Sequence, residues 1–599
     1  MTSPPDPAAE YRAGLGHAAA QVAREDARFR AIGLARLGVF LAAAALAVAA
    51  VLSRSALVGT GVAALGLGFA GLIVWHERTL RRLERARRSL AYFERGMARL
   101  EDRWTTSGDD GTRFRDDAHL YATDLELFGL GSLFHLLNTT CTETGAATLA
   151  HWLKAPAPPL EIRDRQAAVR ELAGDLGLRH DLVVTGGAVS GALDSAALRA
   201  WLAAPPVPIP GWTAGVVPLM AITNVAIAVA ALASWIPGIA VVVTYATSIV
   251  VALTVRYRVL GILRDVDLPA RELTRLAGLL DRLSASRFEC SRLAVLARAW
   301  ETSGRAPARE IQALTRLVDL VDARRNQFFA PLSGLLLAGT QLAFAIERWR
   351  RRVGVPAAAW LAAVGEMEAF ASLATEAFEH PEDGYPEIAE PGAPIVAGGL
   401  AHPLLPVSRA VRNDLTLGGE LRLAVVSGSN MSGKSTLLKA LGVNLVLAYA
   451  GAPVRARSLS APLVAVGASL VLRDSLLEGR SRFYAEVLRL KDILALAGTG
   501  APVLFLLDEL LSGTNSHDRA IGARGVLEAL VDRGAVGLVT THDLALTGVA
   551  ERLGPRGANW HFEDTLIDGK LEFDYRLLPG VVRRSNALEL MRAVGIEVQ

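Results

Sequence analysis

A glycine-rich segment in the C-terminal third of this chain limits the fold more than any other feature of the sequence. Residues 428–436 fit the pattern G-x-x-x-x-G-K-[ST], and the apolar, strand-like run from Leu421 to Val426 comes just before them. In such a loop, backbone N–H groups surround phosphate oxygens, the lysine reaches the β and γ phosphates, and the following hydroxyl binds Mg²⁺. The pattern therefore predicts a nucleotide site in an α/β domain, and a chance match in a glycine-rich chain is the alternative.

The predicted phosphate-binding residues are Gly428, Ser429, Asn430, Met431, Ser432, Gly433, Lys434, Ser435 and Thr436. Lys434 is expected to act in catalysis, and Ser435 is expected to be a metal ligand. The helix that follows the loop would direct its positive end at the phosphates.

Two further apolar runs end in polar residues that suit nucleotide hydrolysis. Val503 to Leu507 is followed by Asp508 and Glu509, and the run from Leu538 to Thr541 is followed by His542. Asp508 would hold the Mg²⁺ shell, Glu509 would orient or deprotonate the attacking water, and His542 would contact the γ phosphate. Each motif alone has a structural explanation, but three strand-terminal motifs in this order favour one catalytic edge.

These segments resemble the ATPase domain of the MutS proteins. The resemblance rests on Asn430-Met431-Ser432 in the loop, Asp508-Glu509, the segment Ser512 to Asp518, and Thr540-Thr541-His542. The methionine and the Gly-Thr-x-x-x-Asp pattern separate this family from general ABC ATPases. The resemblance implies an ABC-class P-loop ATPase domain of MutS type that uses ATP and Mg²⁺ and works as a homodimer.

By the same resemblance, the segment Glu478 to Phe483 reaches across the dimer interface, with Ser481 near the γ phosphate of the partner's ATP. Two composite sites per dimer follow, and Asp518 would couple them at the interface. The family usually has Ser-Thr-Phe where this chain has Ser481-Arg482-Phe483, so the detailed contact across the interface stays open. An ordinary charged helix start is the alternative.

The middle of the chain resembles the helical lever region of MutS proteins more weakly. Residues 124–166 resemble its start, and Glu366 to Ala374 with Tyr385-Pro386 resemble its end. Generic amphipathic helices are the alternative. The repair members wedge a mispaired base with a Phe-x-Glu segment near the N-terminus, and we find no such segment, so specific binding of mismatched DNA is not expected.

Long uncharged runs predict two transmembrane helical hairpins. Leu37 to Ser53 and Ser55 to Trp75 each approach the roughly 20 residues that cross a hydrocarbon core. A second block, Ala200 to Val255, contains no Asp, Glu, Lys, Arg or His, and it is long enough for two spans that turn at Pro237-Gly238. Buried helices of a soluble protein are the alternative. A mean hydropathy of +0.32 favours membrane contact.

Arginines flank both hairpins, whereas the two turns between the spans hold a single charge, Arg54. By the positive-inside rule, both chain ends and the large segments would lie in the cytosol, with the hairpins in the inner (cytoplasmic) membrane. Two cysteines without ligand spacing agree with a reducing compartment. ATP is cytosolic, so the topology and the phosphate loop agree.

The sequence thus predicts an all-α lever and core region that carries two hairpins, followed by the ATPase domain. The expected divisions are an N-terminal cytosolic helix at 1–30, hairpins at 31–76 and 211–256, a lever-like region at 77–210, a helical core or lever region at 257–380 and the ATPase domain at 381–599.

This organisation favours a membrane-anchored, dimeric ATPase in which ATP binding closes helical levers and hydrolysis releases them. DNA between the levers and membrane lipid are the expected contacts. The alternative is an ATP-driven mechanochemical or transport-associated protein that acts with a membrane partner and not on DNA. A scaffold with vestigial catalysis is disfavoured, because Lys434, Asp508 and Glu509 are all present.

Overall fold

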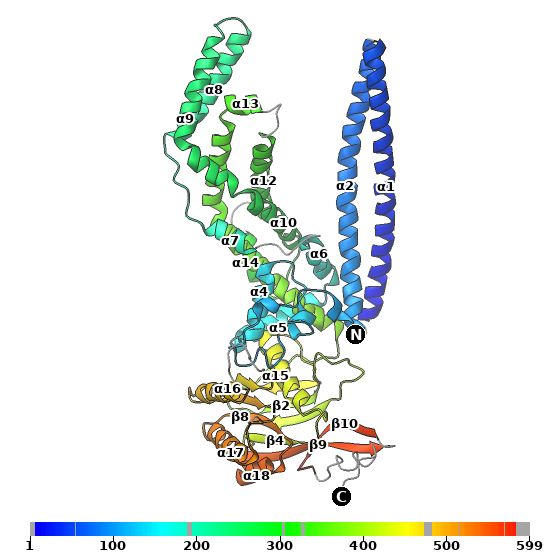
Figure 1. Ribbon diagram of the computed structural model, residues 1–599, viewed down its shortest axis with the longest axis vertical. Coiled ribbons are helices and arrows are strands. Elements are labelled where there is room, and N and C mark those ends of the chain that lie inside the picture. Colours follow the sequence, from blue (N-terminus) through cyan, green and yellow to red (C-terminus); the bar gives the residue numbers. More distant parts are fainter. Residues whose placement is uncertain are drawn as a thin grey trace.

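The computed structural model describes residues 6–53, 55–187, 195–301, 306–324, 330–471, 482–512, 514–567 and 570–582. The molecule is elongated (Figure 1). Two helical hairpins rise at one end, a helical body fills the middle, and the α/β region with the phosphate loop forms the other end.

The first hairpin consists of α1 (Pro7–Ser53) and α2 (Ala56–Leu100). α1 runs through residue 30 without interruption, so the predicted N-terminal helix and the first span are one element. Near the base, Tyr11 packs edge-to-face against Tyr92 and Phe378. The uncharged stretches in the upper part leave their large apolar side chains exposed.

The second hairpin consists of α8 (Thr213–Leu232) and α9 (Ile239–Arg264), and it also exposes most of its apolar side chains. Among the described residues, five helices are long and apolar enough to cross a membrane, by length and composition only: α1, α2, α8, α9 and α14 (Ala338–Glu379). In α14, 78% of the most apolar stretch is buried, whereas that share is at most 17% in the other four. α14 is therefore a core helix over most of its length.

The helical body surrounds α14. It also contains α3 (Leu133–Leu137), α4 (Glu143–Lys154), α5 (Pro159–Ala173), α6 (Leu176–Gly186), α7 (Ser195–Ala203), α10 (Asp267–Ser284), α11 (Ser291–Glu301), α12 (Pro307–Ala323) and α13 (Ala330–Leu335), with 3-10 turns at Trp104–Thr106 and Thr112–Phe114. The leucines at i, i+3, i+4 spacing along α10 are fully buried, so this stripe belongs to the core.

Two sheets build the C-terminal region. A four-stranded sheet has the order β1-β5-β2-β3, from Glu387–Ile388, Ser458–Ala461, Ile395–Leu400 and Asn413–Leu417. A six-stranded sheet has the order β10-β9-β4-β8-β7-β6, from Lys570–Pro579, Gly557–Ile567, Leu423–Ser427, Val536–Thr541, Val503–Leu507 and Ala465–Ser469. The five strands from β9 to β6 are parallel, and β10 is antiparallel to β9. β4 and β7 are fully buried, as expected for apolar runs inside a parallel sheet.

The helices of this region are α15 (Lys434–Ala450), α16 (Arg482–Ala497), α17 (Ser516–Asp532) and α18 (Thr547–Arg552), with 3-10 turns at Leu544–Leu546 and Gly554–Arg556. α15 packs between the sheet and the body helices α4 and α5. A Cβ on Gly442 of α15 would lie 2.6 Å from Leu125 Cδ2, so α15 packs closely against the Leu125 side chain at this position. The body and the α/β region therefore share one continuous core.

Candidate nucleotide site

Three neighbouring strands bring the predicted motifs to one edge of the six-stranded sheet. β4 and β8 pair in parallel with Ser427 opposite Thr541, and β7 pairs with β8 with Leu507 opposite Val539. The loop after β4, the carboxylates after β7 and the histidine after β8 therefore leave the sheet at the same end. This is the end at which ligands bind in open α/β sheets.

The phosphate-binding loop depends on glycine at both of its ends. Gly428 has φ +148° and Gly433 has φ +102°, a region that side chains with a Cβ rarely adopt. A Cβ on Gly428 would also lie 2.9 Å from Ser432 Oγ. Met431, in the middle of the loop, has φ +71° and an exposed side chain.

Lys434 is the first residue of α15 and is buried under the loop. Its Nζ donates hydrogen bonds to the carbonyl oxygens of Gly428, at 2.9 Å, and Ser429, at 2.7 Å. Burial lowers the pKa of Lys434, while Glu509 and Asp508 act in the opposite direction. The loop thus holds a positive charge at the place where phosphate oxygens would need it.

Two hydroxyl groups in the loop fit a bound phosphate. Ser429 Oγ and Ser432 Oγ are buried and have no hydrogen-bond partner among the described residues. Buried polar atoms normally have a hydrogen-bond partner, so these two hydroxyls are available to donate hydrogen bonds to a bound phosphate. For a metal ion, the Ser435 hydroxyl and the Asp508 carboxylate are hard oxygen donors of the kind that Mg²⁺ prefers. The residues present therefore fit both ATP and Mg²⁺.

Thr540 fixes the two acidic residues at the end of β7. Its hydroxyl donates to Asp508 Oδ1 and accepts a hydrogen bond from the Glu509 N–H at 3.1 Å. Glu509 has φ +48°, a left-handed conformation that costs free energy in a non-glycine residue. His542 Nδ1 lies 3.5 Å from Glu509 Oε1, and both side chains are partly exposed. Glu509 and His542 can therefore face a water molecule at the edge of the site.

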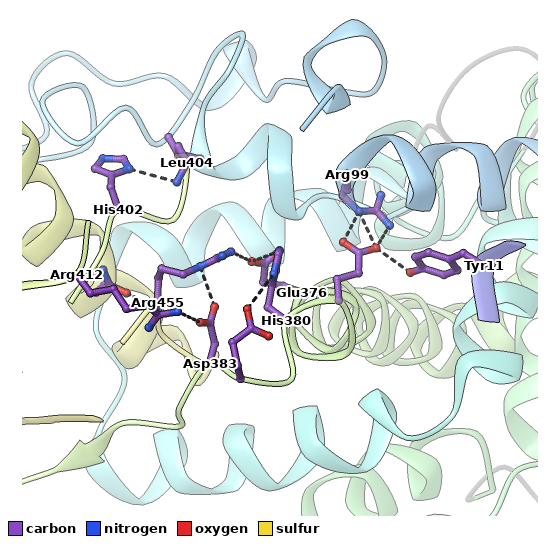
Figure 2. A network of polar contacts seen from close by, with 12 residues as sticks. Tyr11, Arg99, Glu376, His380, Asp383, His402, Leu404, Arg412 and Arg455 are labelled. Atoms are coloured by element: carbon purple, nitrogen blue, oxygen red, sulfur yellow. Dashed lines mark hydrogen bonds and ion pairs between the residues drawn. The ribbon is translucent and has the colours of Figure 1, made fainter. Parts of the chain in front are cut away.

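A pocket of about 730 Å³ continues from the loop toward the residues between β2 and β3. Apolar and aromatic side chains from distant segments line it beside Lys434: Leu405, Val411, Phe562 and Tyr575. Such a lining suits a flat, apolar-faced group such as a nucleotide base. His402 also lines the pocket; burial lowers its pKa to about 4, and its Nδ1 accepts the Leu404 N–H at 3.2 Å (Figure 2).

Tyr575 is held next to the phosphate loop by a local irregularity. The pairing of β9 with β10 shifts register between Phe573 and Leu577, and Tyr575 has φ +53°. The Asn413 side chain donates to Tyr575 O at 3.0 Å and accepts the Leu577 N–H at 2.8 Å. Sequence reasoning missed Tyr575, Phe562 and the positioning role of Thr540. The sequence also resembles the MutS proteins at Asn413-Asp414, and this is the nearest signal to the pocket.

Of the predicted site residues, the structure brings together residues 428–436, Asp508, Glu509 and His542. Asp518 lies apart on the exposed start of α17, where its N–H bonds to Asn515 Oδ1 at 2.9 Å. Ser481 lies outside the described residues, so its proposed contact with a partner's ATP stays a prediction.

The fold and the site define a P-loop nucleotide-binding domain of ATPase type, with a parallel sheet and acidic residues on the strand end beside the loop. Residues 424–598 match the family model for MutS domain V, and residues 120–205 match the model for MutS domain III. These matches, together with the relatives below, support a place in the MutS family. The domain V match lies within the expected ATPase domain at 381–599, and the domain III match lies within the region at 77–210.

Relatives with this similarity include an Endonuclease MutS2 of Thermus thermophilus, 38% identical over 197 residues, which cover 33% of this chain and 25% of the relative. A DNA mismatch repair protein MutS 2 of Halobacterium salinarum is 36% identical over 242 residues, 39% of this chain and 27% of the relative. A DNA mismatch repair protein MutS of Natronomonas pharaonis is 34% identical over 242 residues, with the same coverage. The chain thus spans about a quarter of the length of these curated relatives.

Proposed function

We propose that this protein is a membrane-anchored, MutS-like ATPase that works as a homodimer and couples ATP binding and hydrolysis to movement of its helical body. The observation that carries the proposal is the convergence of the phosphate loop, Asp508, Glu509 and His542 at one sheet edge. Two loop hydroxyls there have no hydrogen-bond partner in the part of the chain that the structure describes. ATP hydrolysis itself rests on this geometry and on the match to MutS domain V.

In the proposed reaction, each side chain has one task. Bound Mg²⁺ would supply charge neutralisation at the phosphates, with Ser435 and Asp508 as its ligands. Lys434 leaves the loop carbonyls and pairs with phosphate oxygens. Glu509, oriented by Thr540 through its backbone, positions the water and takes its proton. His542, beside Glu509, contacts the γ phosphate, and Ser481 completes the partner's site.

A chain of buried polar contacts supports transmission from the ATPase domain to the membrane end (Figure 2). At one side, Arg455 pairs with Glu376 at 3.3 Å and with Asp383 at 2.9 Å. One turn along α14, Glu379 pairs with Arg99 of α2 at 2.6 Å. The end of α14 therefore touches both the ATPase domain and the base of the first hairpin. This supports coupling between the ATPase domain and the membrane end, which the second candidate function, a mechanochemical role at the membrane, requires.

The membrane role rests on the exposed apolar surfaces of α1, α2, α8 and α9, which lipid would cover. We place both hairpins in the inner membrane, with the ATPase domain and the helical body in the cytosol. A membrane protein partner remains a candidate for the mechanochemical role. DNA as a ligand is suggested by the names of the relatives, and the contact need not be specific for mismatches.

The experiment that tests the proposal measures ATP turnover of the full chain in lipid nanodiscs and in detergent, alone and with homoduplex, mismatched and branched DNA. Glu509→Gln is the control for contaminating ATPase activity. Stimulation by DNA that fades as salt rises would support the DNA-directed role. Turnover that is indifferent to every DNA but depends on lipid would support the membrane role. Wild-type turnover no faster than that of Glu509→Gln would reject the ATPase proposal.

A further inference from the structure

A loop segment of the helical body, residues 117–124, docks on the ATPase domain beside the nucleotide site. The Ala468 N–H of β6 donates to the Leu120 carbonyl of this segment at 2.8 Å. β6 is the edge strand of the six-stranded sheet, and its neighbour is β7, after which Asp508 and Glu509 follow. The body therefore contacts the ATPase domain one strand away from these two acidic residues.

Asp124, at the end of this segment, fixes the chain where β6 ends. Its Oδ1 accepts the N–H groups of Leu470 at 2.7 Å and Val471 at 3.0 Å, the two residues that follow the strand. Asp124 is 3% exposed, and burial raises its pKa against the lowering effect of these hydrogen bonds and of Arg489. A buried carboxylate is costly unless it is hydrogen-bonded, so this contact constrains how the two regions fit together.

The end of β6 in turn holds the proposed metal ligand. The carbonyl of Ser469, the last residue of β6, accepts the Asp508 N–H at 2.9 Å. The next residue along the chain is Leu470, whose N–H bonds to Asp124. One backbone step therefore separates the carboxylate of the body from the carbonyl that orients Asp508. Asp508 is held from β8 by the Thr540 hydroxyl and from β6 by this carbonyl.

Arg489 of α16 makes a second connection to the docked segment. Its guanidinium donates to the carbonyl oxygens of His119 and Asp117, each at 2.9 Å. It also lies 3.9 Å from Asp124 Oδ2. A guanidinium has several donors in a fixed geometry, so one side chain can hold two carbonyls and face a carboxylate at once. Arg489 thus attaches α16 to the segment that carries Asp124.

The same helix reaches the chain just after Glu509. Glu486, one turn before Arg489, is 1% exposed and accepts the Leu511 N–H at 2.6 Å. Residues three apart lie on the same side of a helix. Leu511 has φ +56° and Glu509 has φ +48°, and such conformations persist in non-glycine residues only where their surroundings hold them. α16 therefore joins the docked segment to the turn that presents Glu509.

We propose that Asp124 is a positioning residue for the nucleotide site, which holds the end of β6 and thereby sets the position of Asp508. Arg489 supports the same docking through α16. Docking of segment 117–124 is then a condition for full use of Mg²⁺ in ATP turnover. The inference rests on the proposed ATPase function. It gives the helical body a route to the metal ligand that is separate from the contacts of α14.

The phosphate loop lies farther from the docked segment than the acidic residues do. It follows β4, and both β8 and β7 lie between β4 and β6. Binding of the phosphates at Lys434 should therefore survive a loss of docking, whereas the metal-dependent step should not. Nucleotide affinity and Mg²⁺ requirement thus become separate readouts.

The test measures ATP turnover of the full chain in nanodiscs against free Mg²⁺ concentration, and binding of a fluorescent ATP analogue in parallel. In Asp124→Ala, we expect kcat to fall and the half-maximal Mg²⁺ concentration to rise, each about tenfold or more, as for loss of an outer-shell partner. The affinity for the analogue should stay within about twofold of the wild type. The half-maximal Mg²⁺ concentration does not depend on the folded fraction, so destabilisation alone would not shift it.

Two further variants are controls. Asp124→Asn keeps an oxygen that can accept both N–H groups, because both bond to Oδ1, so this variant should restore most of the turnover. Asp116→Ala is the matched control, because its exposed carboxylate accepts the Ala118 N–H, two residues along the same loop, at 3.1 Å. Its Mg²⁺ requirement should equal that of the wild type. A shift in Asp116→Ala as large as in Asp124→Ala would contradict the inference.

Arg489→Ala tests the same docking without removing a buried carboxylate, and it decides the matter where Asp124→Ala yields no folded protein. Its Mg²⁺ requirement should also rise. An unchanged Mg²⁺ requirement in Arg489→Ala and in any folded Asp124→Ala overturns the inference and leaves the ATPase proposal standing. A loss in Asp124→Asn as large as in Asp124→Ala overturns the role of Oδ1 as acceptor. Wild-type turnover no faster than that of Glu509→Gln removes the ATPase proposal, and this inference with it.

Discussion

The two hairpins are attached to the molecule in different ways. The first hairpin contacts the helical body near its base, through the Tyr11, Arg88 and Arg99 side chains, and its upper part stands apart from the other helices in Figure 1. The second hairpin is joined at mid-height by Asn224 to α13, and so to α14. The first hairpin is therefore held at its base by the buried Arg99–Glu379 ion pair, whereas the second hairpin packs against α13 and α14.

The largest expected effect is at the ion pair between Arg99 and Glu379, at the base of the first hairpin. Arg99→Ala leaves Glu379, whose side chain is fully buried, without its guanidinium partner. Removing one member of a buried ion pair costs about 3–5 kcal/mol, so we expect the base of the first hairpin to open. This opening can be measured by hydrogen exchange of the α1 and α2 amides near Tyr11 and Arg99. We expect these amides to exchange faster in Arg99→Ala than in the wild type.

Arg87→Ala is the matched control, because it removes an exposed pair with Asp26 on the same hairpin. An exposed pair contributes at most about 1 kcal/mol. Equal increases in hydrogen exchange in Arg99→Ala and Arg87→Ala would contradict the claim that the Arg99–Glu379 pair holds the base of the first hairpin.

The next effect concerns α14, which contacts both hairpins. Glu368 on α14 is buried and accepts the Cys141 and Thr142 N–H groups at 3.1 and 3.2 Å. Burial raises its pKa from 4.5 to about 7, against the lowering effect of these hydrogen bonds. Between those pH values the folded state binds more protons than the unfolded state, so stability falls as pH rises through this window, by about 3 kcal/mol.

Glu368→Gln has no proton to lose, so its unfolding free energy should lack this decline between about pH 4.5 and 7. Thermal unfolding of both proteins across that range measures the difference. Parallel pH profiles for the two proteins would show that Glu368 is not the group responsible.

The smallest effect is expected at the second hairpin. Asn224→Leu leaves the Leu335 carbonyl without its donor, which costs about 1–3 kcal/mol. The Thr223 hydroxyl donates within its own helix, to Leu219 O, so Thr223→Val should stay within about 0.5 kcal/mol of the wild type. Unfolding measurements in nanodiscs compare the stability of the two variants. A larger loss of stability in Thr223→Val than in Asn224→Leu would contradict the importance of the hydrogen bond from Asn224 to the Leu335 carbonyl.

The sequence predicted the parts of this protein that depend on local patterns. The phosphate loop and the strand-end motifs after β7 and β8 were found because each is a short run with its own chemistry. Asp508, Glu509 and His542 meet because parallel strands end at one edge, which topology rules allow one to expect.

Features built from distant segments were missed. Phe562 and Tyr575 join the nucleotide pocket through the bulged pairing of β9 and β10, and no local pattern marks that bulge. The contact between Asn224 of α8 and the Leu335 carbonyl of α13 was missed for the same reason, because the two residues are far apart in the chain.

The most direct test of the central claim compares ATP binding and turnover in wild type and Glu509→Gln under identical conditions, with Mg²⁺ and lipid nanodiscs. The account predicts that both proteins bind a fluorescent ATP analogue with similar affinity, and that the variant hydrolyses ATP at least about 100-fold more slowly, as expected for loss of a general base. Turnover at the wild-type rate in Glu509→Gln would contradict the assignment of this site as the catalytic centre.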